Sequence, residues 1–245
     1  MDSLRCARVT SLPNLTDQAR RLIALGVPGI SGKSLTCLRD VAGGGDEDGV
    51  LLVVNPDLAP ASTLAPLVEV NGKKGFVVTD MVDVDEFESV VPLPDSGLYL
   101  VSGLDRGDEM ANWSPDEALP AITASGRTPL TLTEGLHWLL QQPSVLERNA
   151  CFMTVASRRP KPGGRLDART PAIWLSNGNG RDGRDNRDAP KVGWCWAGNR
   201  HTWLGFASGS GRRPVDGSPL RRTARASGPL GRPGGPATAG RACPG

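Results

Sequence analysis

The sequence predicts an α+β fold, with antiparallel strands and hairpins at both ends and a helical segment in the centre. Short β-favouring runs bounded by Gly, Pro and Asn occur before residue 103 and again after residue 150. Three capping-box spacings, which mark the start of helices, gather between these two regions. Strand and helix patterns do not alternate, so a doubly wound parallel sheet is not expected.

The N-terminal third begins with an amphipathic helix over residues 14–25, which places Leu15, Ala19, Leu22 and Ile23 on one face. A Gly/Pro break and a second short helix over residues 33–41 follow it. The run GGGDEDG has the composition of a solvated loop. The aliphatic run over residues 50–54 then predicts a buried strand.

A hairpin is predicted where residues 67–70 and 76–79 flank the run NGKKG. The acidic stretch after it suggests that Asp83 and Asp85 lie on the solvent side of a strand. Residues 98–102 predict another strand.

The centre predicts three helices, near residues 115–125, 132–141 and 144–148, because Ser114, Thr131 and Ser144 are each followed three residues later by Glu. Strands are expected to return at residues 151–156 and 172–175. The run NGNGRDGRDNRDAP between the later strands is too rich in Gly and Asp to form a regular element.

The most unusual run is KVGWCWAGNRHTWLGFAS, residues 191–208, which holds three of the six tryptophans. Gly198-Asn199 between two β-favouring runs predicts a hairpin turn. That turn would pair Trp196 with His201, Cys195 with Thr202 and Trp194 with Trp203. Because side chains alternate along a strand, Trp194, Trp196, His201 and Trp203 would share one face, with Cys195 on the other.

Composition divides the chain into a single domain, residues 1–209, and a tail, residues 210–245. The tail carries seven Arg and one Asp, a net charge of +6 against +2 for the whole chain, which leaves −4 on the body. An acidic body disfavours a nucleic-acid-binding fold. The tail has almost no apolar residues and is expected to be disordered. A frame-shifted or misread C-terminus would also explain its composition.

The five cysteines are scattered and form no C-x-x-C pair, so neither a disulfide framework nor a zinc site is expected. The N-terminus has no continuous apolar segment of the signal-peptide kind. The longest aliphatic run is far shorter than the roughly 20 residues of a membrane span. These observations predict a soluble cytoplasmic protein with no membrane partner.

Four motifs favour structural interpretations over chemical ones. GVPGISGKS has Val27 where a Walker A loop needs Gly, and follows a helix rather than a strand. The predicted register separates Cys195 from His201, which argues against a nucleophile pair. Asp105, Arg106, Asp108 and Glu109 fit a self-paired turn, although such carboxylates could also bind metal or act as acid and base. Asp182, Asp185 and Asp188 lack the alternate spacing of a calcium loop.

A family resemblance is carried by GRTPLTLTEGLHWLL, residues 126–140, and by the tryptophan-rich run. It extends to LIALGVPGI, LDRGDEMANWSPDEALPAI, VLERNACFMTVASR and TPAIWLSNG. In these segments the chain resembles an actinobacterial family known as domain of unknown function 5701. The resemblance covers most of residues 15–208 and ends before the tail. It implies no activity, cofactor or catalytic residue.

The leading functional expectation is a non-enzymatic domain that binds a small ligand or a protein partner through Trp194, Trp196, Asn199, His201 and Trp203. The second is a hydrolase or transferase with His201 as base and Asp105, Asp108 or Glu109 as acid or metal ligand. The third is single-stranded nucleic-acid binding by the tail arginines and stacked indoles. No cofactor or metal is expected.

Overall fold

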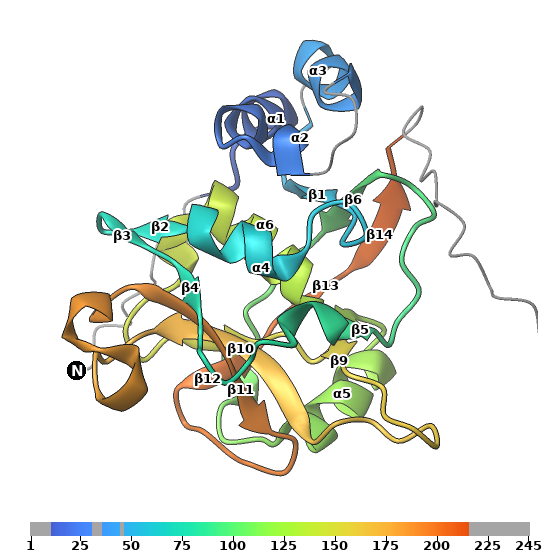
Figure 1. Ribbon diagram of the computed structural model, residues 1–245. Coiled ribbons are helices and arrows are strands. Elements are labelled where there is room, and N and C mark those ends of the chain that lie inside the picture. The colour runs from blue at the N-terminus through green and yellow to red at the C-terminus, as the bar shows by residue number, and fades with distance from the viewer. Residues whose placement is uncertain (1–10, 31–35, 45–46, 216–245) are drawn as a thin grey trace, which may run out of the picture.

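The computed structural model describes residues 11–30, 36–44 and 47–215 (Figure 1). Its helices are α1 (Leu15–Ala24), α2 (Val27–Ile30), α3 (Thr36–Gly43), α4 (Ala61–Leu64), α5 (Pro115–Ala124) and α6 (Leu132–Gln141). Short 3-10 turns are η1 (Ala65–Leu67), η2 (Val84–Glu86), η3 (Asp108–Met110), η4 (Pro143–Val145), η5 (Gly180–Asp182) and η6 (Arg184–Asn186).

Two sheets form the frame of the fold. The first has three strands in the order β1 (Val50–Val54), β6 (Leu98–Ser102) and β14 (Gly211–Pro214). The second has five strands in the order β12 (Leu204–Phe206), β8 (Cys151–Met153), β10 (Arg169–Leu175), β11 (Pro190–Trp196) and β4 (Phe76–Val77). The remaining strands pair in twos: β2 (Glu69–Val70) with β3 (Lys73–Lys74), β5 (Glu88–Ser89) with β9 (Ser157–Arg158), and β7 (Thr128–Pro129) with β13 (Ser208–Gly209). These elements confirm the predicted α+β class.

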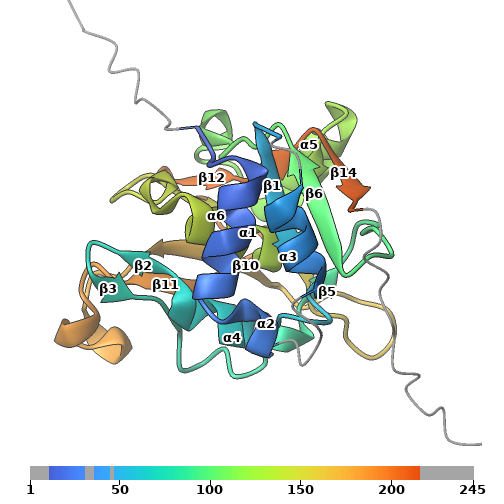
Figure 2. The same ribbon diagram turned by 90° about the horizontal axis from the view of Figure 1, so that it is seen from above.

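Helix α6 lies between the two sheets, and all of its residues are buried (Figure 1). Its N-terminus is closed by the predicted capping box of Thr131 and Glu134. Gly135 lets it approach the five-stranded sheet closely, because a Cβ there would press on Phe152 and Ile173. Helices α1 and α3 cover the three-stranded sheet from the other side (Figure 2). The core therefore has four layers in this order: helices α1 and α3, the three-stranded sheet, helix α6 and the five-stranded sheet.

The open edge of β1 is closed by side chains instead of a further strand. Gln18 of α1 donates to the Val50 carbonyl oxygen at 2.7 Å and accepts from the Leu52 amide at 2.9 Å. Two residues after Leu52 on the same strand, the Val54 amide donates to Nε2 of His137 at 3.2 Å. An exposed strand edge is a template for aggregation, and these contacts remove it.

A hairpin forms at NGKKG, but its second strand is Lys73–Lys74 and not the predicted residues 76–79. Val70 pairs with Lys73, which makes Asn71 and Gly72 the two turn residues. Both have positive φ, +50° and +76°, as a two-residue turn of the primed type requires. Phe76–Val77 instead pairs in parallel with β11.

The predicted hairpin at Gly198-Asn199 is wrong. Strand β12 pairs in parallel with β8, while β8 and β10, and β10 and β11, are antiparallel, so β11 and β12 run in the same direction. Neither Gly198 nor Asn199 has the positive φ that a two-residue hairpin turn needs. The chain therefore crosses the sheet between the two strands. The predicted pairs Trp196–His201, Cys195–Thr202 and Trp194–Trp203 do not form.

The predicted tail begins too early. Residues 211–214 form β14, which pairs with β6 from Gly211–Ser102 to Pro214–Tyr99. The folded part of the chain thus extends at least to Val215. Residues 216–245 lie outside the described residues. So do residues 31–35, which include the end of the GVPGISGKS run and the start of the second predicted helix. The third predicted central helix is only the turn η4.

Gly205 in β12 allows the turn at Arg106-Gly107 to lie directly on the strand. A Cβ at this position would clash with the backbone of both residues, so we expect Gly205→Ala to lower the free energy of unfolding by about 2 kcal/mol. Gly211→Ala is the matched control, because a Cβ there meets open space. Urea unfolding of both variants measures the difference, and equal midpoints would contradict this packing.

Candidate functional site

The structure separates the tryptophan and histidine side chains of the 191–208 run into two groups. Trp194 and Trp196 contact each other edge to face, with ring centroids 4.6 Å apart. His201 and Trp203 contact each other at 5.3 Å. Trp194 pairs with Pro171 on one face of the sheet, whereas Trp203 contacts Trp174, which belongs to the opposite face. The expected single face of three indoles and one imidazole is therefore wrong.

Trp194 and Trp196 lie beside an ion-pair network centred on Arg169. Its guanidinium donates to Asp83 at 2.5 and 3.0 Å and to Asp167 at 3.0 Å, and lies over the rings of Phe87 and Trp194. Hydrogen bonds from Arg169 lower the pKa of both carboxyl groups. Asp83 is thus largely buried in an ion pair, which corrects the expected solvent-facing position. Trp196 remains 48% exposed.

Asp85 also differs from its predicted role on the solvent side of a strand. Its carboxylate accepts from the amide and hydroxyl of Ser62 at 2.9 and 2.5 Å, close to the start of α4. The segment is the turn η2 rather than a strand.

Trp203 and His201 belong to a second aromatic row at the other end of the sheet. Trp203 contacts Trp174 at 6.1 Å, and the ammonium of Lys191 lies 4.8 Å above the Trp174 ring. Asp182 in turn holds Lys191 at 2.7 Å. No described residue hydrogen-bonds the buried Nε2 of His201, and burial lowers the pKa of this imidazole. The backbone N–H of Asn199 donates to the backbone carbonyl of Trp196 at 2.9 Å.

Cys195, which lies between Trp194 and Trp196 in the sequence, has an unreactive thiol. Cys195 is buried, and burial raises the pKa of its thiol to about 11. A thiol with that pKa stays protonated at neutral pH, and only the thiolate is a good nucleophile.

The loop from Asp105 to Glu109 is fixed by its own contacts. Asp105 accepts from the Gly107 amide at 2.8 Å, and Arg106 donates to both carboxylate oxygens of Asp108 at 2.8 and 2.5 Å. The loop backbone does lie beside β12, since the Phe206 amide bonds the Gly107 carbonyl at 3.3 Å. Within the described part of the chain, no hydrogen bond or ion pair joins His201 to these carboxylates.

Across residues 11–30, 36–44 and 47–215, no group of three or more His, Cys, Asp or Glu side chains is placed to hold a metal ion. Over the same ranges, no helix has the length and apolar character to cross a membrane.

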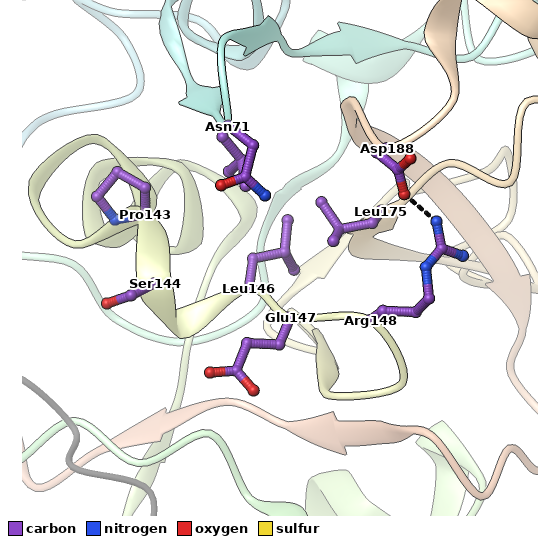
Figure 3. A pocket seen from close by; sticks show the side chains of 9 residues that line it. Asn71, Pro143, Ser144, Leu146, Glu147, Arg148, Leu175 and Asp188 are labelled. Atoms are coloured by element: carbon purple, nitrogen blue, oxygen red, sulfur yellow. Dashed lines mark hydrogen bonds and ion pairs between the residues drawn. The ribbon is translucent and has the colours of Figure 1, made fainter.

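A cavity of about 470 Å³ opens at the end of the five-stranded sheet where β10 finishes (Figure 3). Four separate segments contribute to its wall. They are the β2–β3 hairpin, turn η4 with the residues that follow it, the end of β10 and the chain after η6, which supply Val70, Asn71, Pro143, Ser144, Leu146, Glu147, Arg148, Leu175 and Asp188. Ligand pockets have volumes of about 300–1,000 Å³, and this cavity falls within that range.

The cavity combines an apolar wall with a polar rim. Val70, Leu146 and Leu175 are each at least nine-tenths buried. Arg148 forms an ion pair with Asp188 and donates to the side-chain oxygen of Asn177 at 2.8 Å. Figure 3 shows Leu146 and Leu175 between this ion pair and the Asn71 side chain.

The elements around the cavity are joined to each other. Glu147 and Ala150 exchange backbone hydrogen bonds at 3.1 Å, which closes the turn after η4. Arg106 donates to the Val145 carbonyl at 2.8 Å, and Lys73 donates to the Asp185 carbonyl at 3.2 Å. These hydrogen bonds connect the segments that form the cavity wall.

Sequence reasoning missed this cavity, because each lining residue has a local explanation. Asn71 was explained as a turn residue, Glu147 as a capping residue and Asp188 as part of a rejected calcium loop. The turn at Asn71-Gly72 was the one usable signal, since it fixes where a rim residue points.

One known family matches the chain. It is described as "Family of unknown function (DUF5701)", and the match covers residues 21–215. No curated protein and no solved structure matches.

Proposed function

We propose that this chain, which belongs to the family of unknown function DUF5701, is a non-catalytic domain that binds a small ligand. The cavity at the end of β10 carries the proposal. Ligand sites are typically concave, lined by apolar side chains and bordered by a few polar groups that fix orientation. Val70, Leu146 and Leu175 supply the apolar part, and Asn71 and Arg148 supply polar groups.

The aromatic row of Trp174, Trp203 and His201 supports this end of the sheet as the functional end. Trp174 and Leu175 are neighbours on β10 and point to opposite faces, so the row lies behind the cavity wall. We propose that His201 and Trp203 stabilise the wall rather than contact the ligand.

A second candidate function is protein interaction through Trp194 and Trp196, with Asn199 beside them. The observation that favours it is the half-exposed Trp196, which is supported by Trp194 and the Arg169 network. Tryptophan and arginine are enriched at the energetic centres of protein interfaces.

We also propose that the protein is actinobacterial and that it works in the cytoplasm. Cys151 and Cys195 carry free thiols, which a reducing compartment preserves.

The binding proposal predicts that small aliphatic probes bind and that filling the cavity abolishes binding. Saturation-transfer NMR with hexanol should give signals for the wild type, because millimolar affinity is enough for detection. Ser144→Trp, which places an indole at the cavity, should remove these signals. Ala124→Trp on α5 adds an exposed indole away from the cavity and should keep them. Equal signals from all three proteins would contradict the proposal.

A further inference from the structure

The charges that line the cavity do not cancel. Glu147, Arg148 and Asp188 are its three charged residues, which gives a net charge of −1. Arg148 and Asp188 neutralise each other in an ion pair, and Asn177 holds the other side of the guanidinium. The remaining charge is therefore that of Glu147.

Glu147 has no ion-pair partner among the described residues. Arg106 lies near enough to interact with its charge, but the guanidinium of Arg106 is committed to Asp108 and to the Val145 carbonyl. With Arg106 and Asp108 included, the five charged side chains still sum to −1. The lining of the cavity thus carries one unpaired negative charge, that of Glu147, which a bound ligand would feel.

The turn that carries Glu147 is closed by hydrogen bonds of its backbone. Its amide and carbonyl both bond Ala150, and the Cys151 thiol donates to the same carbonyl at 3.3 Å. Leu146, the preceding residue, is 2% exposed and forms part of the apolar wall. An exposed carboxylate next to a buried leucine suits a ligand that has an apolar body and a positive group at one end.

From these observations, and resting on the proposed binding function, we infer that the ligand is a small organic cation, an amine attached to an aliphatic or cyclic body. The body occupies the space beside Val70, Leu146 and Leu175, and the ammonium group pairs with Glu147. The side-chain oxygen of Asn71 is a further acceptor at the rim. A carboxylate on the same body would be repelled by Glu147.

Three probes of equal length test this inference: hexylamine, hexanol and hexanoate. For the wild type we expect hexylamine to bind about fivefold more tightly than hexanol, the ratio typical of one partly exposed ion pair, and hexanoate to bind most weakly. Glu147→Gln should bring hexylamine to the affinity of hexanol and leave hexanol unchanged. Glu69→Gln removes a nearby carboxylate that does not line the cavity, and should keep the wild-type order.

The outcomes separate the inference from the function on which it rests. If hexanol and hexylamine bind equally, or if Glu147→Gln leaves their ratio unchanged, the ligand class is wrong and the binding function stands. If no probe binds the wild type, both fall. Ligand-observed NMR titrations at low and high salt provide the affinities, and the hexylamine advantage should shrink as salt rises.

Discussion

Replacing Arg212 with methionine is expected to lower the free energy of unfolding by about 3–5 kcal/mol. Arg212 of β14 donates to the two carboxylate oxygens of Glu134 at 2.6 and 2.7 Å and to the Pro129 carbonyl at 2.8 Å. It also bonds the Thr128 hydroxyl. The Glu134 side chain is fully buried, so removing its cationic partner leaves an uncompensated charge in the core.

The adjacent residue provides the control for this prediction. Arg213 pairs with Glu47, but both side chains are about half exposed, so Arg213→Met should cost less than about 1 kcal/mol. Chemical denaturation of both variants gives the comparison. Adding Glu134→Gln to Arg212→Met should recover part of the loss, since the buried charge is then gone. Similar losses for the Arg212 and Arg213 variants would contradict the central role of this pair.

Acid is expected to destabilise the protein through His137, at pH values where most carboxylates are still ionised. Its Nδ1 bonds the Thr133 carbonyl at 2.8 Å and its Nε2 accepts from the Val54 amide, so both ring nitrogens are occupied in the neutral form. Burial lowers the pKa of His137 from 6.5 to about 4. Between these values the unfolded chain binds a proton that the folded chain does not, so stability falls as pH falls.

This shift in pKa corresponds to a loss of about 3 kcal/mol across the window. Urea unfolding at a series of pH values measures the slope. His137→Gln offers an acceptor to the Val54 amide without titrating and should flatten the slope. His201→Gln should change it less, because His201 is only partly buried. An unchanged slope in His137→Gln would rule out this origin of the acid sensitivity.

Local patterns predicted the elements that local interactions determine. Strands β1 and β6 were predicted with their observed bounds, because continuous apolar runs closed by polar residues indicate buried strands. Helix α6 was predicted from its capping box. A hairpin at NGKKG was predicted from its turn-forming residues, but not the two-residue turn at Asn71-Gly72 that the structure shows.

The errors concern partners that are distant in the sequence. Gly198-Asn199 resembles a hairpin turn, yet β12 gains a better neighbour in β8, some fifty residues earlier. Arg212 lies in a segment whose composition indicates disorder, but the pairing of β14 with β6 and the buried ion pair with Glu134 fix it in the fold. The cavity escaped prediction for the same reason, since its wall comes from segments between Val70 and Asp188.

Methyl-resolved NMR during a hexanol titration tests the binding function most directly. We predict that the methyl signals of Val70, Leu146 and Leu175 shift together with increasing probe, while those of Leu22 in α1 stay in place. Shifts confined to the indole N–H signals of Trp194 and Trp196, with the three cavity residues unmoved, would contradict the assignment of binding to the cavity.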